Sequence, residues 1–364
     1  MDRTAELIAK TRHLLPDLDE LEEVLAEEPE TIISRAFPVA ESELRARGML
    51  SRGIVPMEFN ELDVATERER MRIVGAARRA VSKIRARGED AVLEPDEANS
   101  YEAIVWMVGR PAILIQNGRF FPPPRGWETL EEVRASIEKT CQSVGRIEVS
   151  GHPLLDWIGT GFLVAEDVVM TNRHVAKEFC RLGESGHWVF ELGMESRIDY
   201  VEELGALESA EYALTEVIGI HEEFDLALFR ASHHSVQGEG PPEPLTIATE
   251  VPGAREGRKV YVVGYPEWDG RRNDPEVMRR IFNDVYGVKR LQPGEMREVF
   301  GDRPLFYHDC STLGGNSGSC VVDLETNQVI GLHFSGRYLE ANKAVALWAL
   351  RNDPLIRQAS VHFD

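Results

Sequence analysis

The chain has 364 residues, of which 43% are hydrophobic and 28% charged, a globular composition that excludes wholesale disorder. Its formal net charge of -21 argues against a broad nucleic-acid-binding surface, because a phosphate backbone requires a basic footprint. The length allows one large domain or two ordinary ones.

The N-terminal sequence MDRTAELIAKTRHLLPDLDE lacks the apolar stretch and the cleavage site of a signal peptide. No window of the sequence approaches 18 apolar residues, so we expect no transmembrane helix and no membrane partner. Four cysteines are few for a secreted protein of this size, and we interpret them as free thiols. They are Cys141, Cys180, Cys310 and Cys320. We therefore predict a cytoplasmic protein.

The first 60 residues favour helices, and Asp and Glu dominate residues 17–30. The apolar positions at helical spacing are Leu7, Ile8, Leu14, Leu15, Leu18, Leu21 and Leu25. Residues 64–87 predict a second helix of opposite charge, ended by Gly88. We interpret its basic face as a surface packed on the acidic segment, in preference to a nucleic-acid-binding surface.

Residues 101–121 contain two apolar runs, and the second, ended by Asn117-Gly118, predicts a strand and a turn. Three consecutive prolines, residues 122–124, form the clearest linker signal, because they stiffen the chain and exclude a helix or a central strand. We therefore divide the chain into a mostly helical N-terminal region, residues 1–125, and a second domain, residues 126–364.

The second domain begins with a predicted helix from Thr129 to about Cys141, whose first residue and Glu132 are spaced as a capping box. From Val144 onward the pattern changes to short β-rich runs separated by turn signals, which indicate an all-β barrel or sandwich. Residues 236–244 interrupt the series near its middle, as a connection between two barrels would. The last part, residues 344–360, returns to helical spacing.

Three short segments of this domain hold residues with catalytic chemistry. His174 ends a strand–turn–strand run in TNRHVA, Asp225 begins the apolar strand DLALF, and Ser317 lies between glycines in GGNSGS. Taken singly, each has an ordinary explanation as a polar strand end, a turn residue or a flexible turn. Taken together, in this order and at these separations, they predict a catalytic triad.

The segments TNRHVA, DLALF and GGNSGS resemble the trypsin-like serine peptidases, and most closely the V8-like branch of staphylococcal glutamyl endopeptidases. The resemblance covers about residues 144–350. It implies two antiparallel six-stranded β-barrels, about residues 144–236 and 245–350, with a C-terminal helix. Secreted members of the family place disulfides near the catalytic His and Ser, so pairing of Cys180, Cys310 or Cys320 stays an alternative. Residues 1–143 have no counterpart in that catalytic domain.

The resemblance implies hydrolysis of protein or peptide substrates through an acyl-enzyme. Ser317 needs His174 to accept its proton, and His174 needs the carboxylate of Asp225 to fix its tautomer and stabilise the imidazolium. The backbone N–H groups of Gly315 and Ser317 are expected to form the oxyanion hole. No His/Cys cluster has metal-ligand spacing, so we predict no metal and no organic cofactor.

In this family the pocket for the residue before the cleaved bond is lined by two segments. Here they are Ser311, Thr312, Leu313, His333, Phe334, Ser335 and Gly336. Ser311 stands where trypsin has the Asp that confers Arg/Lys preference. Thr312 and His333 match a Thr and a His that bind the substrate carboxylate in glutamyl endopeptidases, and a hydroxyl and an imidazole can jointly hold one carboxylate. We expect cleavage after Glu or Asp. The alternative is that His333 merely fills the pocket wall.

Two regions depart from the family. The connection from Glu267 to Phe306 is long and contains a helix-like pattern over residues 275–290, which suggests a specificity or exosite loop. Residues 1–125 suggest a regulatory region that binds a partner protein, as in a bacterial signalling or defence effector. The predicted function is an intracellular serine endopeptidase. The alternative is a catalytically silent binding or scaffold module on a protease fold.

Overall fold

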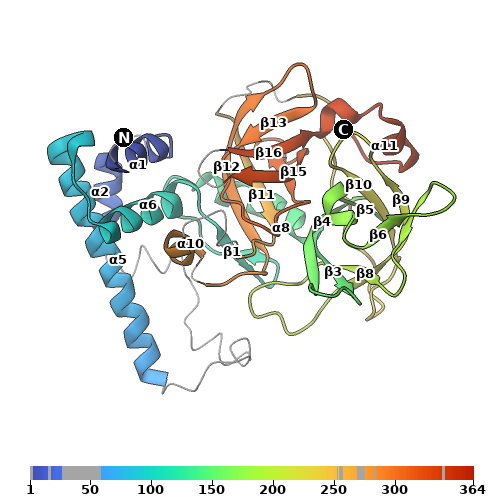
Figure 1. The fold of residues 1–364 in the computed structure, drawn as a ribbon, viewed down its shortest axis with the longest axis horizontal. Helices are drawn as coiled ribbons and strands as arrows, with labels where there is room; N and C mark the ends of the chain where they lie inside the picture. Colours follow the sequence, from blue (N-terminus) through green and yellow to red (C-terminus); the bar gives the residue numbers. More distant parts are fainter. Residues whose placement is uncertain are drawn as a thin grey trace. The chain divides into compact units, whose positions relative to one another are not determined.

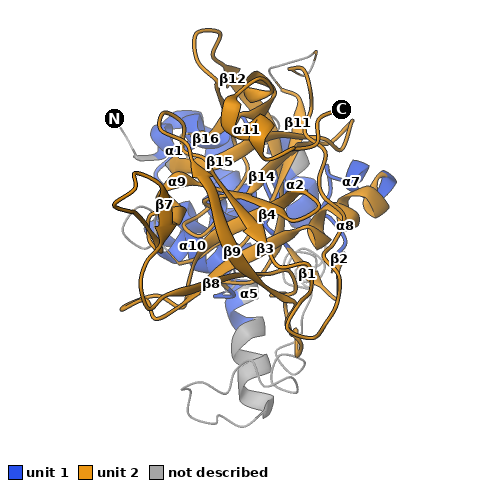
Figure 2. Cartoon of the chain, turned by 90° about the vertical axis from the view of Figure 1, so that its right-hand side faces the viewer, with its two compact units in different colours: residues 1–113, 121–132, 270–285 blue, residues 114–120, 133–269, 286–364 orange. Residues whose placement is uncertain are grey.

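The computed structural model describes residues 3–14, 18–26, 59–251, 253, 257–268, 275–282, 284–337 and 341–364. The chain divides into two compact units (Figure 2). Unit 1 comprises residues 1–113, 121–132 and 270–285, and unit 2 comprises residues 114–120, 133–269 and 286–364. Leu15, residue 17 and residues 27–58 of the predicted helical region lie outside the described residues.

The described part of unit 1 consists mainly of helices (Figure 1). They are α1 (Arg3–Thr11), α2 (Leu18–Ala26), α5 (Phe59–Arg87), η1 (Gly88–Asp90), α6 (Pro95–Gly109), α7 (Thr129–Glu132) and α10 (Pro275–Phe282). Helix α5 confirms the basic helix predicted for residues 64–87, and its apolar side, including Val74 and Val81, is buried. Gly88 follows with a φ of 59°, a left-handed conformation that glycine adopts at little cost at a helix end.

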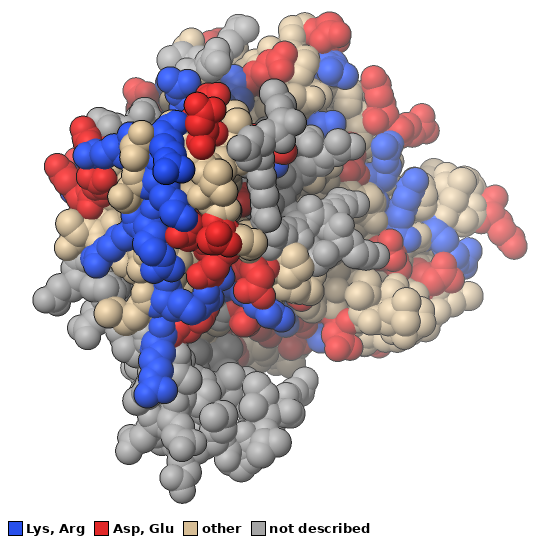
Figure 3. Space-filling view, turned by 60° about the vertical axis from the view of Figure 1, so that its left-hand side comes forward, with Lys and Arg blue, Asp and Glu red and all other residues tan. Residues whose placement is uncertain are grey.

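The basic face of α5 is matched by acidic groups of unit 1. Arg85 pairs with Asp19 and with Glu22 of α2. Lys83 Nζ lies 2.6 Å from Glu97 Oε2, and this carboxylate is buried in α6. Figure 3 shows the Lys and Arg side chains as a continuous strip with Asp and Glu beside it. These contacts confirm a basic face packed on an acidic helix.

Six strands of unit 2 close into a first antiparallel barrel, in the order β10-β5-β4-β3-β8-β9. Their bounds are β3 (Val144–Ser150), β4 (Trp157–Ala165), β5 (Val168–Thr171), β8 (Glu195–Asp199), β9 (Glu211–Ile220) and β10 (Ala227–Ala231). Buried side chains such as Ile147, Leu163 and Phe229 fill the interior, as alternation along each strand requires. A separate hairpin pairs β6 (Cys180–Leu182) with β7 (Trp188–Phe190).

The second barrel runs β11-β14-β15-β16-β13-β12 and is closed by the pairing of β11 with β12. Its strands are β11 (Lys259–Gly264), β12 (Arg290–Val299), β13 (Leu305–His308), β14 (Cys320–Asp323), β15 (Val329–Arg337) and β16 (Ala341–Ala346). The hairpin of β1 (Ile113–Gln116) and β2 (Arg119–Phe120) extends the sheet beyond β12. Asn117 and Gly118 turn it with φ of 51° and 71°, which confirms the predicted strand and turn.

Short helices complete unit 2: α8 (Arg134–Gln142), α9 (Arg173–Ala176), η2 (Leu347–Leu350) and α11 (Pro354–Gln358). Asp353 caps α11, where its side chain accepts from the backbone N–H groups of Leu355 and Ile356. Two closed six-stranded barrels, a C-terminal helix and a helical N-terminal region confirm the predicted fold class.

Two local predictions were wrong. The helix expected from Thr129 to Cys141 is divided into α7 and α8, and Thr129 Oγ1 is buried without a hydrogen-bond partner in the described structure, so no capping box forms. The first turn of α7 is instead satisfied by the carbonyls of Trp127 and Glu128. Residues 344–346, expected to be helical, belong to strand β16, because pairing with β13 and β15 outweighs a local helical pattern.

Candidate active site

Strands β5 and β10 bring His174 and Asp225 together. The two strands are antiparallel with Thr171 opposite Ala227, so the residues after β5 face those before β10. His174 lies in α9, and its Nδ1 is 2.7 Å from Asp225 Oδ2. The backbone N–H of His174 donates to Asp225 Oδ1 at 2.9 Å. Two contacts therefore fix the imidazole against the carboxylate.

The carboxylate of Asp225 stays charged in this arrangement. Burial acts to raise its pKa, but the hydrogen bonds from His174 and the positive charge of Arg173 lower the pKa below its ordinary value. A charged Asp225 accepts the Nδ1–H of His174, which leaves Nε2 as the nitrogen that can take up a proton. The His174 side chain is 49% exposed, so Nε2 is accessible to an incoming molecule.

Gly159 of β4 lies between the backbone of Ser317 and the side chain of Val175. A Cβ on Gly159 would lie 2.8 Å from Ser317 O and 2.9 Å from Val175 Cγ2, so this close approach requires glycine. Val175 directly follows His174 in the chain. In the described residues the His174 side chain bonds Asp225 and makes no hydrogen bond to Ser317. Contacts between a nucleophile and its base often tighten only when substrate is bound.

The loop before Ser317 points two backbone N–H groups in a fixed direction. The carbonyl of Gly314 accepts from Glu267 N at 2.7 Å, and the carbonyl of Asn316 accepts from Ser319 N at 2.9 Å. A trans peptide carries its C=O and N–H on opposite sides, so the N–H groups of Gly315 and Ser317 face away from these partners. Within the described residues neither N–H donates to another protein group. Both are available to an oxygen atom.

The predicted pocket residues fall into a buried group and a half-buried group. Ser311, Thr312, Leu313 and His333 are buried, whereas Phe334, Ser335 and Gly336 are half-buried. Thr312 Oγ1 lies 2.8 Å from Asn342 Oδ1, and Gly336 leaves no room for a Cβ beside Asn342. The structure thus brings the segments around Thr312 and Gly336 together through Asn342, a residue that the sequence did not single out.

His333 has a second histidine as its partner. His308 Nε2 lies 3.1 Å from His333 Nδ1, and both rings are buried. Burial lowers the pKa of His308 to about 4 and lowers that of His333 well below its ordinary value, helped by the neighbouring histidines. Both imidazoles are therefore neutral at pH 7. His333 therefore does not place a permanent positive charge in the pocket.

The unpaired atom of His308 indicates the tautomer. Its Nδ1 is buried without a partner in the described structure. A buried N–H without a partner is rarer than a buried acceptor without one, so Nδ1 is the unprotonated nitrogen and Nε2–H donates to His333. His333 then carries its own proton on Nε2, as a hydrogen-bond donor. Sequence reasoning missed His308, because only strand register brings it beside Asn342 on β16.

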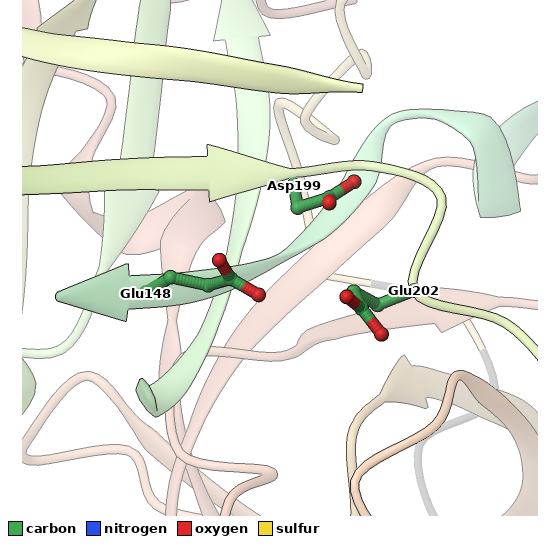
Figure 4. A group of neighbouring side chains, drawn as sticks. All are labelled: Glu148, Asp199 and Glu202. Carbon is green, nitrogen blue, oxygen red and sulfur yellow. The ribbon is translucent and has the colours of Figure 1, made fainter. Parts of the chain in front are cut away.

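One group of described side chains lies close enough to hold a metal ion: Glu148, Asp199 and Glu202 (Figure 4). Both oxygens of Glu148 already face arginines, with Arg146 Nη2 at 2.5 Å and Arg197 Nη2 at 2.9 Å. Arg146 also lies 2.9 Å from Glu202. Two guanidinium groups occupy the positions that a cation would take, so we assign no metal to this cluster.

The four cysteines are free thiols, as predicted, and all four are buried. Burial raises the pKa of Cys180 and of Cys320 to about 12 and raises that of Cys141 further, which keeps these thiols protonated and unreactive. None of the helices in the described residues is both long enough and apolar enough to span a membrane.

Comparison with known proteins connects this geometry to a peptidase family. Residues 159–332 match the trypsin-like peptidase domain. A probable serine protease of Lysobacter enzymogenes is 28% identical over 303 residues, an alignment that covers 72% of this chain and 76% of that protein. A glutamyl endopeptidase of Staphylococcus epidermidis is 26% identical over 189 residues, which cover 51% of this chain and 57% of the endopeptidase.

Solved structures give a more distant similarity. The active form of the Rv3671c protease of M. tuberculosis is 20% identical and aligns with a TM-score of 0.41. That alignment covers 62% of this chain and 84% of the protease.

Proposed function

This chain carries a trypsin-like serine peptidase domain, and we propose that it hydrolyses peptide bonds with His174, Asp225 and Ser317 as catalytic residues. The observation that carries the proposal is the His174–Asp225 contact of 2.7 Å beside the Ser317 loop. A serine hydroxyl is a weak nucleophile until a positioned base accepts its proton, and an imidazole held by a carboxylate is such a base.

In the proposed mechanism, His174 Nε2 takes the proton of Ser317 Oγ while that oxygen attacks the substrate carbonyl. Asp225 stabilises the imidazolium that forms. The imidazolium then gives its proton to the departing amine, and an acyl-enzyme remains. Water repeats the sequence, with His174 as its base, and releases the acid. Gly315 N–H and Ser317 N–H would bind the oxyanion, a contribution of roughly 3–4 kcal/mol per donor in comparable enzymes.

We propose that the pocket accepts Glu, and Asp less well. The neutral His333 would donate its Nε2–H to the substrate carboxylate, and the Thr312 hydroxyl would turn to it from its present acceptor, Asn342 Oδ1. No acidic side chain replaces Ser311 to attract Arg or Lys. The similarity to a glutamyl endopeptidase supports the same preference.

A regulatory role for unit 1 is supported by helix α10. This helix lies within the connection that follows β11, yet it belongs to unit 1, where Val277, Met278 and Phe282 are buried. Arg280 Nη1 donates to Ser100 Oγ of α6 at 2.9 Å. The same connection supplies Glu267 N–H, which holds the carbonyl of Gly314 next to the proposed oxyanion hole. We propose that unit 1, alone or with a partner protein, controls the Ser317 loop through this connection in an intracellular effector protease.

The catalytic proposal is tested with Ser317→Ala in the full chain. We expect turnover of peptides to fall by on the order of 10⁴- to 10⁶-fold while the fold is retained. Equal cleavage by the wild type and the variant would contradict the proposed mechanism, and a folded wild type that cleaves nothing would favour the scaffold alternative.

The regulatory proposal is tested with Arg280→Met, which removes the bond to Ser100. The matched control is Arg279→Met on the exposed side of the same helix. We expect kcat/KM on a short peptide to change at least about tenfold in Arg280→Met only. A folded Arg280→Met variant with an unchanged rate would remove unit 1 from the mechanism.

A further inference from the structure

Thr160 of β4 is a fully buried polar residue that contacts the Ser317 loop twice. Its backbone N–H donates to the carbonyl of Ser317 at 2.8 Å, and its Oγ1 donates to the carbonyl of Gly315 at 2.8 Å. The same Oγ1 accepts from Tyr265 N at 3.3 Å, which directs its proton toward Gly315. The side chain therefore donates its hydroxyl proton to one carbonyl of the loop.

That carbonyl lies between the two N–H groups proposed to bind the oxyanion. The peptide from Gly315 to Asn316 separates the peptides that carry Gly315 N–H and Ser317 N–H. Gly315 has a φ of 80°, and glycine has the largest conformational freedom of any residue. On its N–H side the peptide is held by a long turn bond, from Asn316 N to Leu313 O at 3.3 Å. On its carbonyl side it is held by the Thr160 hydroxyl.

We infer that Thr160 is a positioning residue, whose hydroxyl holds the Gly315 carbonyl so that both flanking N–H groups converge on the oxyanion. The inference rests on the proposed function of the Ser317 loop. The other carbonyls of the loop are held by backbone donors, Glu267 N and Ser319 N, which no side-chain substitution removes. At Gly315 the donor is a side chain, so this contact is the one that a substitution can remove.

Loss of the hydroxyl leaves a buried carbonyl without a donor. Such a group is costly, and rotation of the peptide toward water or toward the substrate oxygen relieves the cost. The rotation misaligns the oxyanion donors without changing the pocket around Thr312 and His333. The predicted result is a loss of stabilisation of the transition state and not of the bound substrate, which lowers kcat and leaves KM nearly unchanged.

The test compares Thr160→Val, which keeps the shape, with Thr160→Ser, which keeps the hydroxyl. We expect kcat on a cleaved peptide to fall roughly 10- to 100-fold in Thr160→Val and to be restored in Thr160→Ser, with KM changed less than about twofold in both. Affinity for a peptide aldehyde, whose adduct with Ser317 places an oxyanion in the site, is expected to fall in parallel with kcat. The matched control is Thr140→Val, which removes another buried threonine hydroxyl of unit 2, bonded to Ser136 O.

If Thr160→Val fails to fold, Thr160→Cys replaces it, because a thiol is a weaker donor of similar size. Unchanged kcat in either folded variant would overturn the inference, and so would an equal loss in Thr140→Val. An equal rise of KM would also overturn it, because that result assigns Thr160 to substrate binding. Failure of the proposed function is recognised separately, since the wild type would then show no turnover dependent on Ser317.

Discussion

Two histidine pairs of unit 2, one in each barrel, differ in charge. In the first barrel, half-exposed His174 bonds the carboxylate of Asp225. In the second, buried His333 bonds the imidazole of His308. A carboxylate favours the protonated imidazole, whereas burial beside another imidazole disfavours it. The first pair is suited to moving a proton, and the second to donating a fixed hydrogen bond.

The largest effect is expected from Asp225→Asn, which removes the charge from the first pair. An amide can present its N–H to His174 Nδ1 and so stabilise the wrong tautomer, and kcat is expected to fall about 10⁴-fold. Steady-state kinetics on one peptide gives the ratio. The control is Asp167→Asn, which removes a carboxylate bonded to Arg230 on the same barrel and is expected to leave kcat unchanged. A loss below about tenfold in Asp225→Asn would remove the carboxylate from the mechanism.

A second effect concerns stability at acid pH. Because burial lowers the pKa of His308 from 6.5 to about 4, the unfolded chain binds a proton in this window that the folded chain does not. The contribution of His308 to the free energy of unfolding is therefore fully present above pH 6.5. It is lost as the pH drops toward 4, and amounts to roughly 3 kcal/mol.

Urea unfolding at several pH values, for the wild type and for His308→Gln, measures this contribution. The variant lacks the titrating ring, so its free energy of unfolding should depend less on pH between 4 and 6.5 than that of the wild type. Parallel curves for the two proteins would show that His308 is not buried as a neutral group.

A smaller effect is expected from His333→Ala on substrate choice. Removal of the Nε2–H donor should reduce the preference for a Glu peptide over the matching Gln peptide by about tenfold, the value of one charge-assisted hydrogen bond. A preference for aromatic or small residues that His333→Ala leaves unchanged would end the proposal of acidic specificity.

The sequence sufficed for those parts of the site that depend on local pattern. TNRHVA, DLALF and GGNSGS place a histidine, an aspartate and a serine at strand ends, and the structure brings His174 and Asp225 into contact. Alternating short strands likewise predicted the barrels. Such features need only a few neighbouring residues for their interpretation.

Other parts depend on contacts between distant segments, which a single sequence does not reveal. His308 and Asn342 meet the pocket residues only through the register of β13, β15 and β16. Thr160 contacts the Ser317 loop from a different barrel. Helix α10 was visible as a pattern, but its membership of unit 1 was not. Residues 344–346 formed a strand because barrel closure outweighed their local preference.

The central claim is that Ser317 is a nucleophile activated by His174. Labelling of the intact chain with a fluorophosphonate, followed by peptide mapping, tests it most directly, because the reagent captures only an activated serine and forms a stable bond to its oxygen. We predict one label per chain, at Ser317, and its loss in His174→Ala. Labelling at another residue, or a wild type that cleaves peptides while Ser317 stays unlabelled, would contradict the account.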